Sequence, residues 1–181
     1  AFILGENFIK NDNVALILGD NIFYSDNFLY TLKESIKNNS GATIFGYRVS
    51  NPSDYGIVNI DKKNNIKSLE EKPQNPSSNI AIPGIYIYDN SVINKAKLVK
   101  PSQRGELEIT DLNNFYLDKK NLKLIMLPDE TIWFDTGTCK FYAHASELVR
   151  VIQERKNIIV GSIEEAAFKS GFIDKGQLLD L

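Results

Sequence analysis

Apolar and polar positions alternate with clear periods near the start of the chain, and these periods predict the first elements. Residues 14–18 form a continuous apolar run that ends at Gly19-Asp20, which is typical of a strand buried on both faces of a parallel sheet. Helical spacing follows over residues 27–39, and residues 41–47 predict a second strand. The chain therefore opens as a strand, a crossover helix and a strand, which we expect to be parallel and right-handed.

The middle of the chain changes to shorter segments. Residues 56–60 and 66–70 alternate around a Lys-Lys-Asn-Asn turn and predict an antiparallel hairpin. Further elements are expected as a strand at 80–88, helices at 92–98 and 107–117, a strand at 122–127, a long helix near 140–156 and short helices within 162–181. This pattern predicts an α/β fold, a Rossmann-like mixed and mainly parallel sheet flanked by helices, with a helical C-terminal tail.

No repeat, low-complexity segment or linker divides the sequence. We therefore expect one domain over residues 1–181, with the binding portion at about 1–137 and the helical tail at about 138–181. The chain opens at Ala1 without a methionine, inside what looks like a helix, so we also expect it to be part of a longer protein.

Composition narrows the functional class. The 181 residues are 43% hydrophobic and carry a formal net charge of −2, which indicates a globular core and no basic field for nucleic acid or anionic membranes. No apolar run approaches the roughly 18–20 residues that span a bilayer, so a cytoplasmic location is expected. A single Cys139 and a single His144 exclude a disulfide or a Cys/His zinc site within one chain, so any metal must be held by oxygen.

Two aspartates stand where a strand gives way to a small-residue turn. Asp20 follows the first strand in Leu18-Gly19-Asp20-Asn21, and Asp135 sits in Trp133-Phe-Asp-Thr-Gly137 beside an aromatic residue. Turns and N-caps explain either aspartate alone. Together, with almost no His or Cys to compete, the two carboxylates fit a Mg²⁺ site completed by water and substrate phosphates.

Two further segments contain charged residues that could bind a sugar phosphate. In Leu69-Glu-Glu-Lys-Pro73, Glu71 can accept sugar hydroxyls and Lys72 can place a compact positive charge on a phosphate, although an edge strand with alternating charges explains the segment equally. Arg104 lies in a loop just before a helix start, where its planar fork suits a phosphate. A capped helix with acids in its first turn is the alternative for that segment.

These segments, in this order, resemble the glucose-1-phosphate thymidylyltransferase family, whose members are also called dTDP-glucose pyrophosphorylases. The resemblance runs from Ala1 to the C-terminus. It is carried by Asp54-Tyr-Gly56, Leu69-Glu-Glu-Lys-Pro73, Pro83-Gly-Ile-Tyr86, Arg104-Gly-Glu-Leu-Glu-Ile-Thr-Asp111, Trp133-Phe-Asp-Thr-Gly137 and the tail Glu164-Glu-Ala-Ala-Phe-Lys-Ser-Gly-Phe-Ile-Asp174.

The resemblance implies a nucleotidyl transfer in which dTTP and glucose 1-phosphate give dTDP-glucose and pyrophosphate. It places Mg²⁺ on Asp20 and Asp135, and assigns contacts with the sugar phosphate to Lys72 and Arg104. It also implies a substrate-binding set of Asn21, Tyr55, Gly56, Glu71, Tyr86 and Trp133.

The family's signature begins with a strand, a Gly-rich loop bearing a catalytic Arg and a nearby Lys-Pro, and none of these occurs in this sequence. We therefore expect the chain alone to be inactive. A noncatalytic sugar-phosphate-binding or regulatory module and a UTP-using relative remain alternatives. The resemblance further implies a homotetramer when complete, and feedback by dTDP-rhamnose or a related nucleotide near Glu154 and Arg155, a pair that a solvated helix face also explains.

Overall fold

In the computed structural model, which describes residues 1–181, the main sheet is organised around strand β3 (Ala42–Arg48). One edge of β3 pairs with β7 and then β6, and the other edge pairs with β8. The main-sheet strands are β1 (Val14–Ile17), β3, β4 (Gly56–Ile60), β5 (Ile66–Glu71), β6 (Ile80–Ala81), β7 (Ile85–Tyr88) and β8 (Leu122–Met126), in the order β1-β7-β3-β6-β4-β5 with β8 beside β3. A second sheet joins β2 (Asn21–Tyr24) to β9 (Ile132–Asp135).

The sheet is mixed, as predicted, but it is not mainly parallel. β3 and β8 pair in parallel, while the other main-sheet pairs are antiparallel. β4 and β5 form the predicted hairpin, with Gly56 opposite Glu71. Short connections favour antiparallel neighbours because parallel pairing needs a long crossover.

The first strand differs from its prediction in pairing and burial. β1 runs antiparallel to β7 at the end of the strand order, and its residues alternate between half-buried and exposed. β1 and β3 both run opposite to β7, so they are parallel to each other but not adjacent. The predicted strand, helix and strand are therefore present, with β7 inserted between the two strands.

The strand predicted over 80–88 is broken into β6 and β7. Pro83 has no backbone N–H to give to a ladder, and the N–H of Ile85 donates to the carbonyl of Pro83 at 2.7 Å in a tight turn. The break lets β6 pair with β3 and β4 while β7 pairs with β1 and β3. Asp135 also differs from expectation, because it ends strand β9 rather than lying in a turn.

Within residues 1–135, helices pack on both faces of the main sheet, as expected. The chain has seven α-helices and one 3₁₀ turn. They are α1 (Glu6–Ile9), α2 (Phe28–Lys37), the 3₁₀ turn η1 (Pro52–Asp54), α3 (Val92–Ala96), α4 (Ile109–Asp118), α5 (Cys139–Lys156), α6 (Ile163–Lys169) and α7 (Lys175–Leu179). None of these helices combines the length and the apolar character needed to cross a membrane.

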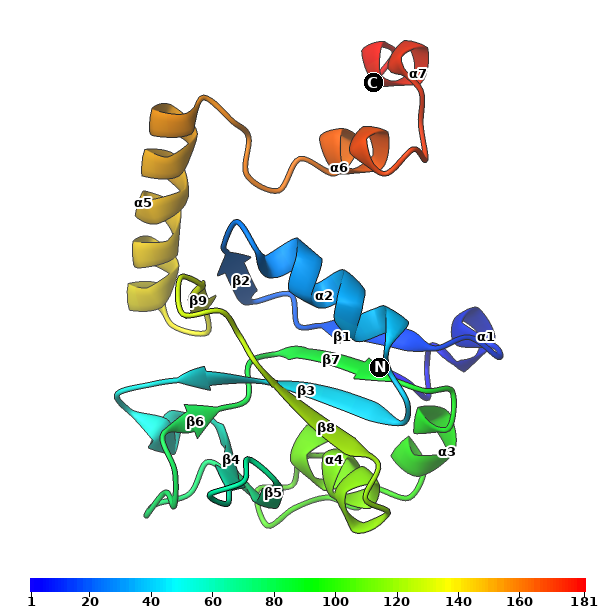
Figure 1. Cartoon of the computed structure of the whole chain (residues 1–181), viewed down its shortest axis with the longest axis vertical. Helices are drawn as coiled ribbons and strands as arrows, with labels where there is room; N and C mark the ends of the chain where they lie inside the picture. The colour runs from blue at the N-terminus through cyan, green and yellow to red at the C-terminus, as the bar shows by residue number, and fades with distance from the viewer. The chain divides into compact units, whose positions relative to one another are not determined.

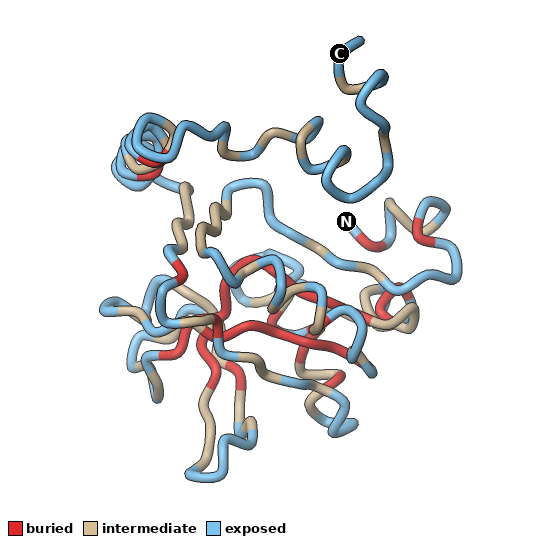
Figure 2. Tube along the Cα trace, turned by 45° about the horizontal axis from the view of Figure 1, so that its top comes forward, coloured by how far each residue is buried: buried red, intermediate tan, exposed pale blue.

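Apolar residues cover both faces of the central strands. On β7, Tyr86 and Tyr88 point into a cluster that includes α3 and α4, whereas Ile85 and Ile87 point into one that includes Phe28 of α2. Figure 1 shows α2 on one side of β1, β7 and β3, with α3 and α4 on the other. Figure 2 shows that the buried residues concentrate in these strands. The period of two along each strand thus serves two cores rather than one.

The contacts of the chain divide it into two compact units, Ala1–Asp135 and Thr136–Leu181. The second unit contains α5, α6 and α7, which confirms the predicted helical tail. Thr138 accepts the N–H of Phe141 at the start of α5, and Asp174 and Gln177 form a capping box at the start of α7. A single domain over residues 1–181 stays a prediction.

Alkaline pH is expected to unfold the first unit because two of its tyrosines are deeply buried. Burial raises the pKa of Tyr86 and of Tyr88 above the ordinary value. Their stabilising effect is complete below about pH 10, and it is lost as the pH rises because only the unfolded chain then releases the phenolic protons. Above about pH 10, we expect the free energy of unfolding to fall by about 1.4 kcal/mol per pH unit for each of the two tyrosines. Urea titrations between pH 8 and 11 measure this slope, and Tyr88→Phe should reduce it.

Candidate active site

The two-stranded sheet brings the predicted acidic residues together. Asp20 directly precedes β2, and Asn21 at the start of β2 lies opposite Asp135 at the end of β9. The side-chain amide of Asn21 donates to the carboxylate of Asp20 at 2.9 Å. Two carboxylates separated by 115 positions in the sequence therefore flank one strand pair.

A cavity of about 230 Å³ opens beside this strand pair, within the first unit. It is smaller than the about 300–1,000 Å³ typical of drug-sized ligand pockets, so it suits a small polar molecule. Nine of the ten predicted site residues line it: Asp20, Asn21, Tyr55, Gly56, Glu71, Lys72, Tyr86, Trp133 and Asp135. The sequence prediction that these residues share a site therefore agrees with their placement, while their individual roles stay predictions.

The side chain of Asn21 is held in place by three hydrogen bonds. Its Oδ1 accepts the indole N–H of Trp133 at 2.7 Å and the backbone N–H of Gly84 at 2.9 Å, while its Nδ2 donates to Asp20. Gly84 is required there because an added Cβ would lie 2.8 Å from Asn21 Cγ. Asn21 thus orients Trp133 and Asp20 in the cavity wall.

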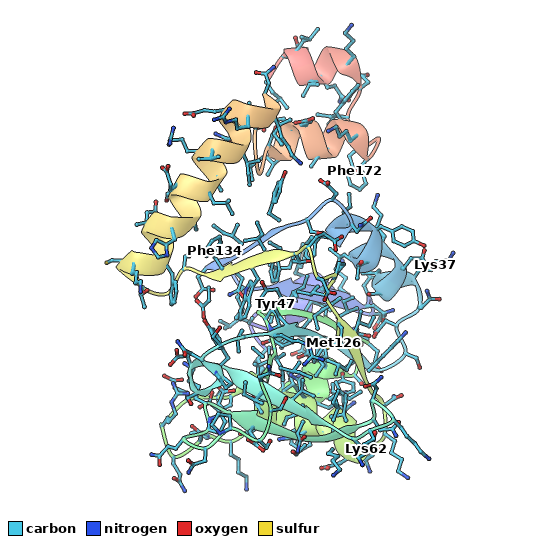
Figure 3. All side chains as sticks on the ribbon, turned by 60° about the vertical axis from the view of Figure 1, so that its left-hand side comes forward. Lys37, Tyr47, Lys62, Met126, Phe134 and Phe172 are labelled. Atoms are coloured by element: carbon cyan, nitrogen blue, oxygen red, sulfur yellow. The ribbon has the colours of Figure 1, made fainter.

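Aromatic rings form one side of the cavity. Trp133 lies 5.0 Å from the ring of Tyr55 and 5.5 Å from that of Tyr47, which belongs to β3. Figure 3 shows Tyr47 near the strand that carries Phe134, whereas Lys62 stands at the far turn of the β4–β5 hairpin. Burial, Asp135 and Asp54 raise the pKa of Tyr55, so its hydroxyl keeps its proton near neutral pH.

Glu71 ends β5 and Lys72 directly follows it, and contacts with other elements constrain both residues. The hydroxyl of Thr110, on α4, donates a short hydrogen bond to Glu71 Oε2. Lys72 has a positive φ of 41°, which is uncommon outside glycine, and its N–H donates to the carbonyl of Tyr55 at 3.1 Å. Strained backbone of this kind is often found where a side chain is held for binding.

Arg104 does not line the cavity but reaches it through an acid. Its guanidinium lies 3.7 Å from Glu71 Oε1, 3.0 Å from Glu106 Oε2 and 3.6 Å from Glu108 Oε1. The side chain is 43% exposed, so these ion pairs are weak and an incoming phosphate can compete for it. Arg104 therefore lies outside the cavity lining but 3.7 Å from Glu71, which belongs to it.

Oxygen donors alone face a possible metal ion. Asp20 and Asp135 line the cavity without any His or Cys, and the chain has no cluster of three or more His, Cys, Asp or Glu arranged for a metal. This donor set fits Mg²⁺, which is usually bound by one or two carboxylates and takes its other ligands from water and phosphates.

Thr110, Asn113, Asp54 and Gly84 also belong to the cavity wall, and sequence reasoning did not select them as site residues. Thr110 and Asn113 come from α4, three residues apart on one helix face. Thr110 could have been selected, because it lies within Arg104-Gly-Glu-Leu-Glu-Ile-Thr-Asp111, one of the segments that carry the resemblance.

The fold and the cavity define an α/β protein with one cavity that combines an aromatic wall, several acids and a lysine. The sequence profile of the nucleotidyl transferase family matches residues 1–151. The chain belongs to the nucleotidyl transferase family.

Curated relatives extend this relationship over nearly the whole chain. Glucose-1-phosphate thymidylyltransferase of Neisseria gonorrhoeae is 46% identical over 175 residues, covering 97% of this chain and 61% of the relative. The enzyme of the same name from Mycolicibacterium smegmatis is 47% identical over 178 residues, covering 98% of this chain and 62% of the relative. The chain thus spans about three fifths of the length of these relatives.

A solved structure shows the same fold. It is described as a glucose-1-phosphate thymidylyltransferase from Bacillus anthracis in complex with sucrose, and it is 40% identical with a TM-score of 0.70. The match covers 81% of this chain and 58% of that chain. The expectation of a nucleotidyltransferase-type α/β fold is therefore confirmed.

Proposed function

We propose that this chain is the sugar-phosphate- and metal-binding part of a glucose-1-phosphate thymidylyltransferase. In the proposed reaction, a phosphate oxygen of glucose 1-phosphate attacks the α-phosphorus of dTTP. The bond to the β-phosphate breaks, pyrophosphate leaves, and dTDP-glucose forms. Support comes from relatives of this name at 46% and 47% identity.

One observation carries the proposal: a single cavity combines acids, a lysine and an aromatic wall. Glu71 can accept sugar hydroxyls, Lys72 can hold a phosphate, and Trp133 offers an apolar face to a sugar ring. An edge strand with alternating charges explains Glu71 and Lys72 alone, but it does not explain why they share one cavity with Trp133.

The charge of the cavity supports a requirement for Mg²⁺. Its lining contains four acids, Asp20, Asp54, Glu71 and Asp135, against one base, Lys72. An anionic sugar phosphate would enter against this excess of negative charge. Asp20 and Asp135 are the residues proposed to hold the ion. When bound, Mg²⁺ supplies positive charge to the phosphate oxygens and neutralises charge that develops during transfer.

The chain's own residues act by positioning and charge rather than as a covalent nucleophile. Lys72 and Arg104 would hold the attacking phosphate, while Glu71, fixed by Thr110, would orient the sugar. Asn21 would keep Trp133 against the sugar ring. Holding two polyanions in line accounts for most of the catalysis in phosphoryl-type transfers.

The test uses the protein expressed from its complete reading frame. With glucose 1-phosphate, dTTP and Mg²⁺, it should release pyrophosphate and form dTDP-glucose, measured by coupled assay and chromatography. A faster reaction with UTP would identify a UTP-using relative. Sugar-phosphate binding with no transfer to either nucleotide would instead support a noncatalytic module and contradict the proposal.

Trp133 provides a direct report of binding because it is the single tryptophan of this chain and lines the cavity. Glucose 1-phosphate should change its fluorescence in a saturable way with Mg²⁺ present. We expect at least about tenfold weaker binding with EDTA, because the acidic lining then repels the phosphate. Trp133→Phe should abolish the signal, and an equal affinity with and without Mg²⁺ would argue against a metal at Asp20 and Asp135.

A homotetramer, a cytoplasmic location and feedback by dTDP-rhamnose or a related nucleotide remain proposals from the same resemblance. In α5, Glu154 binds Arg150 at 2.6 Å, and Arg150 also contacts Glu147 at 2.8 Å. These exposed pairs are typical of a solvated helix face.

A further inference from the structure

Asn113 is a buried amide in the wall of the cavity with one half of its hydrogen-bonding capacity unmet. It lies on α4, has no exposed surface and lines the cavity. Its Oδ1 accepts the hydroxyl of Tyr88 at 2.6 Å, but its Nδ2 has no partner. A buried donor without a partner destabilises its state by a factor of about ten or more in the equilibrium constant.

The orientation of this amide is set from behind by Tyr88. Tyr88 is fully buried on β7, where its ring packs against Phe2, Tyr86 and Tyr116. The hydroxyl of Tyr88 donates to Asn113 Oδ1. The amide therefore presents its NH₂ group, rather than its oxygen, as the unused half.

Asn113 shares one face of α4 with two other residues of the cavity wall. Asn113 follows Thr110 by three residues and Ile109 by four, so the three lie on one helix face, and all three line the cavity. Thr110 holds Glu71, the proposed acceptor of sugar hydroxyls. Lys72 and Arg104 supply the cationic groups that suit a phosphate, so a neutral donor on the same helix face as Thr110 suits a hydroxyl.

A second unmet polar atom shows why the location matters. Thr131 Oγ1 is also buried and without a hydrogen-bond partner, but Thr131 precedes β9 and does not line the cavity. The two atoms carry similar costs, yet only Asn113 borders a space that an oxygen-rich ligand can fill. Thr131 is therefore a matched control.

We propose that Asn113 Nδ2 donates a hydrogen bond to a hydroxyl of the bound hexose and thereby selects sugars that carry this hydroxyl. This inference rests on the proposed function, because it assigns one more contact to the same sugar-phosphate site. A buried donor that only a substrate hydroxyl satisfies discriminates strongly against analogues that lack the hydroxyl.

The experiment measures the affinity of glucose 1-phosphate and of its 2-, 3-, 4- and 6-deoxy analogues by calorimetry with Mg²⁺. The protein is expressed from its complete reading frame as wild type, Asn113→Asp and Thr131→Val. Asn113→Asp keeps an oxygen for Tyr88 but replaces the donor. It should weaken glucose 1-phosphate binding at least about tenfold. The added negative charge weakens every analogue alike, so one deoxy analogue should lose less affinity than the others on Asn113→Asp, which identifies the hydroxyl. Thr131→Val should bind like wild type.

The outcomes separate the two proposals. If wild type fails to bind glucose 1-phosphate, the proposed function and this inference both fail. If wild type binds and Asn113→Asp binds equally well, or loses the same factor with every deoxy analogue, this inference alone is overturned. Should Asn113→Asp not fold, Asn113→Leu gives the same comparison, since it also lacks the donor and suits a buried helical position.

Discussion

Replacing Asp135 with asparagine is expected to lower Mg²⁺-dependent turnover by about 100-fold or more while leaving the fold intact. The amide has the same shape at the end of β9, but it lacks the charged oxygen that a hard cation prefers. The magnitude follows from the loss of charge stabilisation where charge develops in the reaction. Initial rates at saturating substrate and Mg²⁺, together with urea unfolding, measure both parts of the prediction.

The same variant has a readout that does not depend on activity. Burial, Asp135 and Asp54 raise the pKa of Tyr55. Asp135→Asn should therefore move the pKa of Tyr55 down toward its ordinary value, seen as tyrosinate absorbance at a lower pH. Asp118→Asn is a suitable control, because Asp118 is exposed at the end of α4 and does not line the cavity. Near-normal turnover in Asp135→Asn would remove Asp135 from the metal site.

Local signals in the sequence were sufficient for most elements of the fold. The β4–β5 hairpin and helices α2, α4 and α5 were predicted within a few residues, because alternation, helical spacing and turn residues act over short stretches. The pairing of the strands and their relative directions were not predictable in this way. Val14 pairs with Tyr88, and no local pattern specifies a partner so distant in sequence.

Three predictions about the strands were wrong for reasons that are visible in the sequence or the structure. Pro83 lies inside the run that we predicted as one strand, and a proline there favours a break. The burial of β1 was overestimated because a continuous apolar run also suits an end strand with one covered face. Asp135 was placed in a turn because small residues follow it, although pairing with Asn21 keeps it in β9.

The site shows a similar division. Its charged and aromatic members were found through motifs, and nine of the ten meet in one cavity. The contacts that hold them were invisible in the sequence, because Thr110 reaches Glu71 from a different element and Asn21 reaches Trp133 across a strand pair. The unmet donor of Asn113 exists only as a property of packing.

Gly84→Ala is expected to destabilise the protein by about 1–3 kcal/mol and to weaken glucose 1-phosphate binding at least about tenfold. The new Cβ would lie 2.8 Å from Asn21 Cγ and 2.8 Å from Leu18 Cδ1. Cβ atoms in proteins do not approach other heavy atoms this closely. Asn21 would have to move, and with it the hydrogen bonds to Trp133 and Asp20 that shape the cavity. Urea unfolding and fluorescence titration measure the two effects.

Gly46→Ala separates crowding from damage to the site. Its Cβ would lie 2.7 Å from Met126 Sδ and 2.9 Å from Ile80 Cγ2, so it crowds the chain to a similar degree without lining the cavity. We expect it to destabilise the fold, less than Gly84→Ala because a methionine side chain adapts easily, and to leave the affinity unchanged. Equal losses of affinity in the two variants would mean that binding follows global stability. A normal affinity in Gly84→Ala would show that the position of Asn21 does not control the cavity.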